Sequence, residues 1–280
     1  MWGRATRRGG LFKKSTSNVP LIDRNRHAVE VARITFTSTL QTFLSKQPAK
    51  IAAQITDAIA SAEKADKPKK KFIDRILSAL DLSDWVEIVP DAERIIVHVA
   101  QDGGAEGLTQ VNVNDGGITD QVNEDALDWA SDRAAELVGM KYDDDGNLIP
   151  NPDAEWAITD STREMLRSDA ETAMEEGMST DDLAQALVSR YAFSGARAET
   201  IARTELARAD VQGNMIAYKQ SGVVSGKEWL LGSEHVDSDE CDDAEAMGVV
   251  PLDSDFGGIG DPPAHPRCSC DISPVLAGDE

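Results

Sequence analysis

The chain has 280 residues, of which 41% are hydrophobic and 28% charged, a composition typical of a soluble globular protein with a sizeable core. Its net charge of −22 excludes nucleic-acid binding by the average surface, and its three cysteines exclude a disulfide framework. Because the sequence has neither an apolar run of membrane-spanning length nor a secretory signal, we expect a cytoplasmic protein with no membrane partner.

Residues 1–26 are basic and show no hydrophobic periodicity, which predicts an extended arm. Its cations would offer salt-sensitive contacts to DNA phosphates. The candidate binding residues are Arg4, Arg7, Arg8, Lys13 and Lys14. Two other interpretations stay open at this point: the arm docks on an acidic protein partner, or it is a disordered basic tail.

Residues 27–119 predict an N-terminal helical region. Apolar residues recur with helical spacing over His27–Ala65, and we expect Pro48 to divide this segment into two helices. A second amphipathic helix is expected over Lys71–Leu82, where the apolar residues again share one face.

The segment 84–104 is ambiguous, because its valines and isoleucines suit strands while their spacing also suits a helix. We favour a helix that ends at Gly103 and Gly104, since glycine is the common residue after a helix C-terminus. Residues 101–119 are rich in glycine and asparagine and are expected to form a loop.

Residues 120–231 predict a helical core. The first helix, over 119–139, is followed by a loop with a short hairpin around Asp145 and Gly146. Its inward face is predicted to hold Leu127, Ala130, Ala134, Leu137 and Val138. The next helix is expected to begin at Ser161, which has capping-box spacing to Glu164, and another to begin after Ser179.

The last helix of this core, over 196–222, has an inward stripe dominated by small residues, so another helix must lie close against it. The stripe consists of Ala198, Ile201, Ala202, Leu206, Ala209, Gly213, Ile216 and Ala217. Its charged residues allow pairs between Glu199 and Arg203 and between Glu205 and Arg208. Alternatively, Arg203 or Glu205 turns inward and hydrogen-bonds the C-terminal part of the chain.

Residues 232–280 predict a small acidic unit, with thirteen acidic residues and Arg267 as the one basic residue. Short strands are expected at 227–232, 249–253 and 271–275. The predicted fold class is therefore α+β: a mainly helical body with a small C-terminal β-rich unit that carries a Cys/His cluster.

The Cys/His cluster comprises Cys241, His265, Cys268 and Cys270, four side chains of the kinds that bind structural zinc. Reduced structural thiols and a disulfide such as Cys241–Cys268 are the alternatives. A catalytic zinc site needs a general base and an open position, and the sequence has no His-Glu-x-x-His helix. We therefore expect a protein without enzymatic activity, and structural zinc as the only candidate cofactor.

The motifs from residue 161 to 275, and more weakly from 120, resemble in order and spacing the phage head-morphogenesis family, the Mu F-like minor head proteins. In that family an "ARTE" helix leads to a "K.W" strand, an Asp–Cys segment with "PLD", and a closing "PPAHP.CRC". The matching structural residues are Arg203, Glu205, Tyr218, Trp229, Asp237, Pro263 and His265. Two positions depart from the family: Ala244 replaces a common cysteine, and Ser269 replaces the arginine of "CRC".

The resemblance implies a structural minor head, or minor capsid, protein of a tailed phage that acts in procapsid assembly. Implied partners are the portal protein and the major capsid protein or scaffold, with DNA reached through the basic arm. The implied location is the virion head, and the host cytoplasm during assembly. The alternatives are a zinc-dependent nuclease or toxin-like transferase, and an internal DNA-binding head protein.

Overall fold

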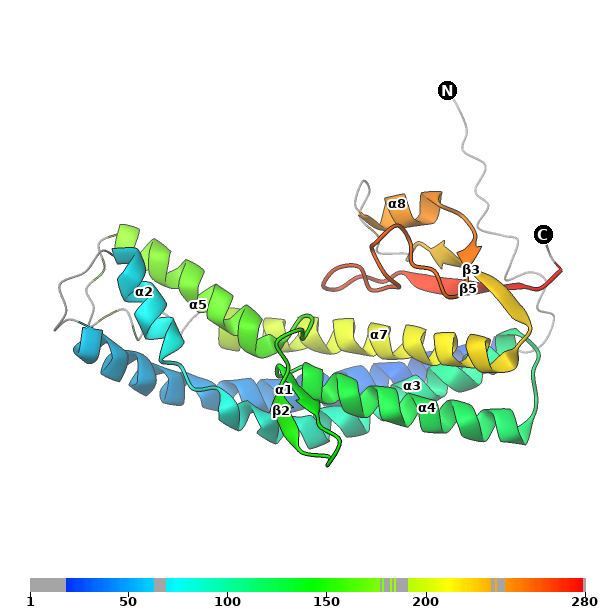
Figure 1. Cartoon of the computed structure of the whole chain (residues 1–280), viewed down its shortest axis with the longest axis horizontal. Helices are drawn as coiled ribbons and strands as arrows, with labels where there is room; N and C mark the ends of the chain where they lie inside the picture. Colours follow the sequence, from blue (N-terminus) through cyan, green and yellow to red (C-terminus); the bar gives the residue numbers. More distant parts are fainter. Residues whose placement is uncertain are drawn as a thin grey trace, which may run out of the picture.

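The computed structural model describes residues 19–62, 69–176, 191–232 and 240–278, together with Met178, Asp182, Ala184 and His235. It consists of an elongated body of long helices and a small unit that lies along one side of it (Figure 1). The body contains α1 (Val19–Ala62), α2 (Lys69–Ser78), the 3-10 helix η1 (Ser83–Ile88), α3 (Val89–Gln110), α4 (Gly116–Glu136), β1 (Met140–Tyr142), β2 (Leu148–Pro150), α5 (Ile158–Glu175), the 3-10 helix η2 (Tyr191–Phe193) and α7 (Gly195–Ser221). The small unit contains β3 (Val224–Leu230), α8 (Glu240–Ala246), β4 (Val250–Pro251) and β5 (Asp271–Leu276). The predicted fold class is confirmed.

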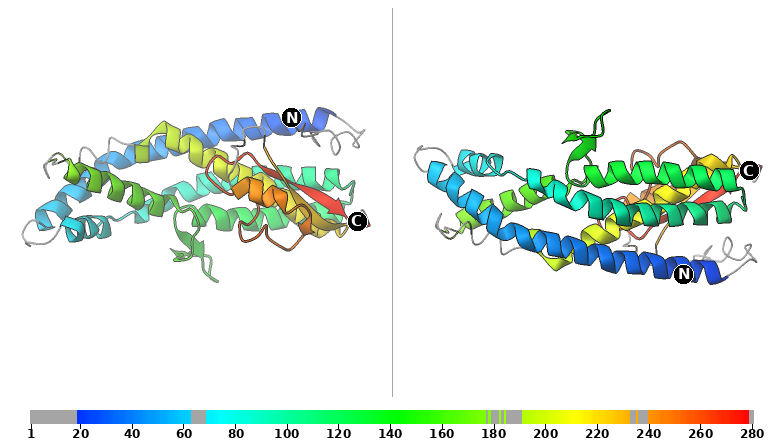
Figure 2. Two further views of the ribbon diagram at one scale, coloured as in Figure 1. Left: turned by 90° about the horizontal axis from the view of Figure 1, so that it is seen from above. Right: turned by 90° about the horizontal axis from the view of Figure 1, so that it is seen from below.

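Helix α1 is continuous through Pro48, so the prediction of two helices was wrong. A proline inside a helix removes one backbone hydrogen bond and bends the helix, but packing can hold both halves helical. The amide of Gln47 donates from Nε2 to the Phe43 carbonyl at 3.1 Å, which adds a hydrogen bond beside the proline. Figure 2 shows α1 changing direction along its length.

The start of α1 at Val19 also corrects the predicted arm, because residues 19–26 belong to the first turns of this helix. Pro20 suits that position, since a proline in the first turn removes an N–H that has no partner within the helix. The five candidate cations of the arm, from Arg4 to Lys14, lie outside the described residues.

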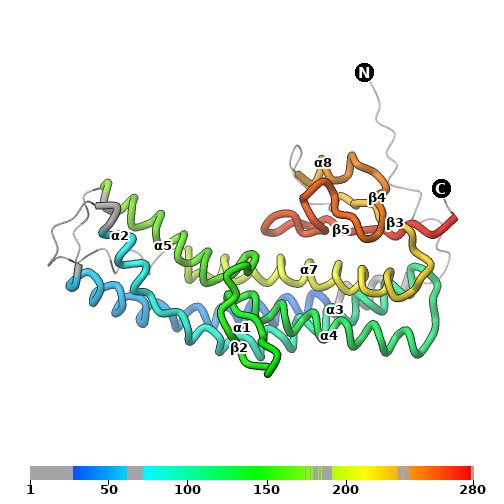
Figure 3. The backbone as a smooth tube through the Cα atoms, viewed as in Figure 1, coloured from blue at the N-terminus to red at the C-terminus, as the bar shows by residue number. Residues whose placement is uncertain are grey.

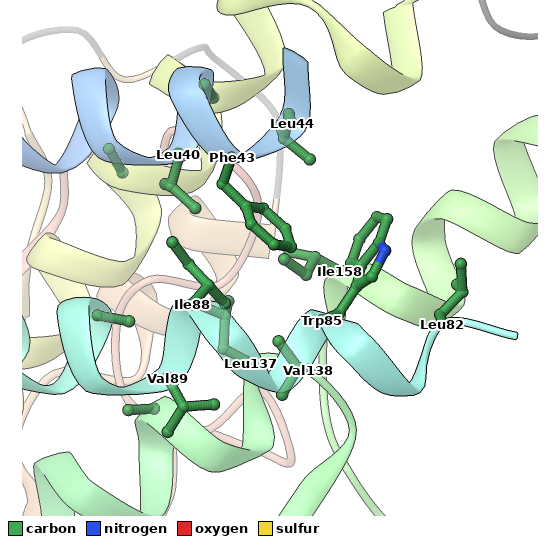
Figure 4. Packing of buried hydrophobic residues seen from close by; sticks show 14 of the residues in the cluster. Leu40, Phe43, Leu44, Leu82, Trp85, Ile88, Val89, Leu137, Val138 and Ile158 are labelled. Atoms are coloured by element: carbon green, nitrogen blue, oxygen red, sulfur yellow. The ribbon is translucent and has the colours of Figure 1, made fainter. Parts of the chain in front are cut away.

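The helical body has one hydrophobic core, to which α1 to α5 and α7 all contribute. At its centre the rings of Phe43 and Trp85 meet edge to face, with centroids 5.4 Å apart. In Figure 4 the side chains of Leu40, Ile88 and Leu137 point toward this pair from three different segments. The segments 27–119 and 120–231 therefore share one core.

The closest helix contact joins α3 to α7 and explains why the predicted end of α3 was wrong. Helix α3 continues beyond Gly103 and Gly104 to Gln110, so most of the predicted loop over 101–119 is helical. A Cβ on Gly103 would lie 2.5 Å from the Asp210 carbonyl oxygen of α7, and one on Gly213 would lie 2.0 Å from the Ala100 carbonyl oxygen. These glycines permit close helix packing, as the small-residue stripe of α7 predicts.

Three local predictions in the middle of the chain fared differently. The hairpin of β1 and β2 is confirmed, with Tyr142 paired to Leu148. Leu127 was predicted to face inward but is 43% exposed. Helix α5 begins at Ile158, before Ser161, whose hydroxyl donates to the Ala157 carbonyl and so does not cap the helix as predicted. The predicted cap at Ser179 lies outside the described residues.

The C-terminal sheet has three antiparallel strands in the order β4-β3-β5, which confirms the three predicted strands. Its middle strand, β3, precedes residue 232. A second buried cluster joins the sheet to α7, and its members from α7 are Val211, Met215 and Tyr218. Figure 3 shows the unit lying along α7, so this helix belongs to both cores.

Candidate functional site

The Cys/His cluster lies within the core of the C-terminal unit, where three separate segments meet. Cys241 comes from the short helix α8, His265 from the proline-rich loop, and Cys268 from the turn before β5. The Cys241 Sγ lies 3.3 Å from His265 Nε2 and 3.7 Å from Cys268 Sγ. Cys241 and Cys268 are 0% and 5% exposed, so protein atoms enclose their sulfurs.

The ring of His265 is oriented by its own loop. Its Nδ1 lies 3.1 Å from the Pro266 carbonyl oxygen, which can only accept a hydrogen bond. In the neutral ring Nδ1 therefore carries the proton, and Nε2 presents its lone pair toward Cys241. This arrangement is the one in which a histidine serves as a metal ligand.

A second group of three ligand atoms, from His235, Cys241 and Cys270, overlaps the first at Cys241, with all three atoms within 4.8 Å of one another. The Nε2 of His235 lies 3.2 Å from the Asp242 carboxylate. The structure thus places the other three predicted ligands near the Cys241 sulfur. It adds His235, which the sequence did not single out. Its signal was six-residue spacing from Cys241, a weak one in a histidine-poor chain.

The thiols of the cluster differ in their ionisation. A hydrogen bond from the Cys270 side chain, aided by backbone N–H groups, lowers the pKa of Cys268 to about 5 despite burial. The pKa of Cys270 is raised in turn, because its proton is held in the bond to Cys268 and because the group is buried. At neutral pH the cluster therefore favours a thiolate at Cys268, the form that binds metals.

Polar contacts fix the C-terminal unit on itself and on α7. The buried Lys227 of β3 donates from Nζ to the Asp261 carboxylate at 2.6 Å, which ties the proline-rich loop to the sheet. The backbone N–H of Arg267 donates to the Thr204 hydroxyl of α7 at 3.0 Å. Neither Lys227 nor Thr204 was assigned this role from the sequence, because each depends on a contact distant in the chain.

Glu205 of α7 turns inward, but toward another helix and not toward the C-terminal unit. Its carboxylate accepts two hydrogen bonds from Arg133 of α4, at 2.7 Å from Nε and 2.8 Å from Nη2, and both side chains are 3% exposed. Burial opposes the charge of Arg133, but Glu205 and Glu136 outweigh it and raise the pKa of the guanidinium. The predicted partner of Glu205 was therefore wrong, and the neighbouring Thr204 makes the contact expected of it.

The boundary between α7 and the sheet also buries acidic groups. Asp210 Oδ1 is buried and has no hydrogen-bond partner among the described residues. Burial, together with the charges of Asp271, Glu106 and Asp102, raises the pKa of Asp210 well above its ordinary value. Burial likewise raises the pKa of Asp271 to about 6.

Asp210→Asn is therefore expected to stabilise the protein at high pH. A carboxyl whose folded-state pKa is raised loses stability as pH rises from the ordinary aspartate value, about 4, through the folded value. Denaturant unfolding should show a gain of about 1 to 3 kcal/mol at pH 8 and a smaller gain at pH 5. The exposed control Asp128→Asn should change stability by less than about 0.5 kcal/mol. Equal gains at both pH values would contradict the buried-charge explanation.

A family model described as phage Mu protein F like protein matches residues 164–273, the segment from α5 to β5. Residues 164–273, called the Mu F-like domain below, are therefore similar to the phage head-morphogenesis family. No curated protein and no solved structure matched the chain. The Mu F-like domain thus includes α7, the C-terminal sheet and the whole Cys/His cluster.

The structure locates most of the motif residues of the Mu F-like domain. Tyr218 is fully buried on α7 and its hydroxyl donates to Gln110 of α3. Trp229 packs edge to face on Phe256, with centroids 5.2 Å apart. Arg203 is half-buried on α7, Pro263 is buried in the loop beside His265, and Asp237 lies outside the described residues. The motif residues near the cluster are thus mainly core residues.

Two further observations bear on the class of protein. The family of the Mu F-like domain is typically structural. Within the described ranges, no helix has both the length and the apolar character needed to cross a membrane.

Proposed function

We propose that this protein is a minor head protein of a tailed phage and acts in procapsid assembly beside the portal. The match of residues 164–273 to the Mu F-like family carries this proposal, because it indicates a phage head-morphogenesis protein. The portal is the proposed primary partner, with the major capsid protein or scaffold as the second. The protein would act by recognition, without a catalytic step.

The construction of the Mu F-like domain supports a structural role over an enzymatic one. A catalytic zinc site keeps one ligand position open to substrate, whereas Cys241 and Cys268 are buried in the second core. Their cluster holds α8 and the loop against the sheet that covers α7. The exposed acidic surface of this unit and the long helices of the body are then free to contact different partners. DNA contact through the arm stays a prediction, because Arg4 to Lys14 lie outside the described residues.

Co-production of this chain with the portal, scaffold and coat proteins of its phage tests the proposal. Assembled heads would be separated by sedimentation, and their proteins quantified by mass spectrometry. The protein should sediment with heads when the portal is present and stay at the top of the gradient when the portal is omitted. Equal incorporation without the portal would contradict the portal association, and absence from all heads would contradict the head role itself.

A further inference from the structure

We propose that the Mu F-like domain binds one zinc ion through Cys241, His265, Cys268 and Cys270. The proposal stands apart from the assembly role, because it concerns how the C-terminal unit is held together. Its basis is geometric: ligand atoms of two overlapping groups surround Cys241, each group with all its atoms within 4.8 Å of one another.

Two separations within the cluster match the edges of a zinc tetrahedron. With zinc–sulfur bonds of about 2.3 Å and zinc–nitrogen bonds of about 2.0 Å, two sulfurs lie about 3.8 Å apart and a sulfur and a nitrogen about 3.5 Å apart. In the structure Cys241 Sγ is 3.7 Å from Cys268 Sγ and 3.3 Å from His265 Nε2. Three ligands therefore need only small shifts to bind one ion.

The surroundings of His265 complete the requirements of a metal ligand. The Pro266 carbonyl accepts from Nδ1 at 3.1 Å, so Nε2 is the nitrogen that faces the sulfurs. Such an outer hydrogen bond to a ligating histidine is the usual arrangement in metal sites. The His265 ring therefore needs no change of orientation to bind a metal ion through Nε2.

Cys270 supplies the fourth ligand in this proposal. Its sulfur lies within 4.8 Å of Cys241 Sγ, and the side chain also hydrogen-bonds Cys268. His235 is the competing side chain, but its Nε2 faces the Asp242 carboxylate at 3.2 Å, a half-exposed partner outside the sulfur cluster. Three thiolates and one imidazole are a common closed set for structural zinc.

The ion would join three segments of the C-terminal unit that are separate in the sequence. These segments are the two-turn helix α8, the loop that contains His265, and the start of β5. Ala244 lies one turn after Cys241 on α8 and is fully buried, so the other three ligands come from outside that helix.

Metal analysis of the purified full-length protein, produced with zinc in the medium, tests the proposal. Mass spectrometry should find one zinc per chain, and a strong chelator should lower the melting temperature by about 5 °C or more. Cobalt exchanged into the wild-type protein should show the charge-transfer absorption of three thiolates in a tetrahedral site, a readout that needs no variant to fold. Less than a tenth of an equivalent of zinc, or a Cys241–Cys268 disulfide in the isolated protein, would overturn the proposal.

Single variants then identify the ligands. Cys241→Ser, Cys268→Ser, Cys270→Ser and His265→Ala should each lower zinc affinity at least tenfold, while His235→Ala and the distant His98→Ala should leave it unchanged. Circular dichroism would establish that the helical body of each variant is folded. Zinc lost in His235→Ala but retained in Cys270→Ser or His265→Ala would overturn this ligand set.

Discussion

Gly213→Ala is expected to lower the free energy of unfolding by about 3 kcal/mol or more. The added methyl group would lie 2.0 Å from the Ala100 carbonyl oxygen and 2.7 Å from the Gly104 backbone nitrogen, so α3 and α7 must separate. Overpacking usually costs about 1 to 3 kcal/mol, and here the obstructing atoms are backbone that cannot rotate away. The intrinsic helix preference of alanine returns only about 1 kcal/mol. Denaturant unfolding monitored by circular dichroism would measure the loss.

Gly116→Ala is the matched control. Gly116 begins α4, and a Cβ there meets no atom within 4 Å. This variant should be neutral or slightly more stable than the wild type, since alanine restricts the unfolded chain more than glycine does. If Gly213→Ala were as stable as Gly116→Ala, the close packing of α3 on α7 would be refuted.

Glu205→Leu is expected to destabilise the protein by about 3 to 5 kcal/mol. It leaves the 3% exposed Arg133 with two unpaired donors, because Glu136 and the Glu155 carbonyl bind the remaining nitrogen of its guanidinium. The partly exposed Glu136 then compensates the buried charge only in part, and removing one partner of a buried pair costs more than the pair itself contributes. Chemical unfolding at pH 7 would measure the effect.

Two variants separate the buried charge from the loss of a side chain. Glu199 lies on the same helix as Glu205 and forms an ion pair with Arg33 of α1. Because Glu199 is 40% exposed, Glu199→Leu should cost less than about 1 kcal/mol. Combining Glu205→Leu with Arg133→Met removes both charges and should recover most of the lost stability. A double variant as unstable as Glu205→Leu alone would show that the charge is not the cause.

The fold class and most elements could be predicted from the sequence because hydrophobic periodicity is local information. The errors occurred where tertiary packing decides the outcome. The sequence predicts a helix end at Gly103 and Gly104, but Gly103 lets α7 approach and Gly104 makes room for Val122 of α4. Pro48 predicts a break, but buried residues on both sides of it pack in the core and α1 is continuous. Composition cannot distinguish these cases, because the same residue type serves both purposes.

The candidate site was predictable in its residue types but not in its contacts. Cys241, His265, Cys268 and Cys270 stand out in a chain with three cysteines. The addition of His235 requires knowing how the chain folds around Cys241. For Glu205, the sequence left an inward orientation as one of two alternatives, and its partner, Arg133, is 72 residues away and has no local signal.

Particle counts by electron microscopy would test the central claim, that the protein acts in head assembly, most directly. Portal, scaffold and coat proteins would be produced with this chain and without it, and closed heads that contain a portal would be counted. We predict that adding the protein raises the share of such heads and that the protein sediments with them. An unchanged share of portal-containing heads, with the protein left entirely in the soluble fraction, would contradict the claim.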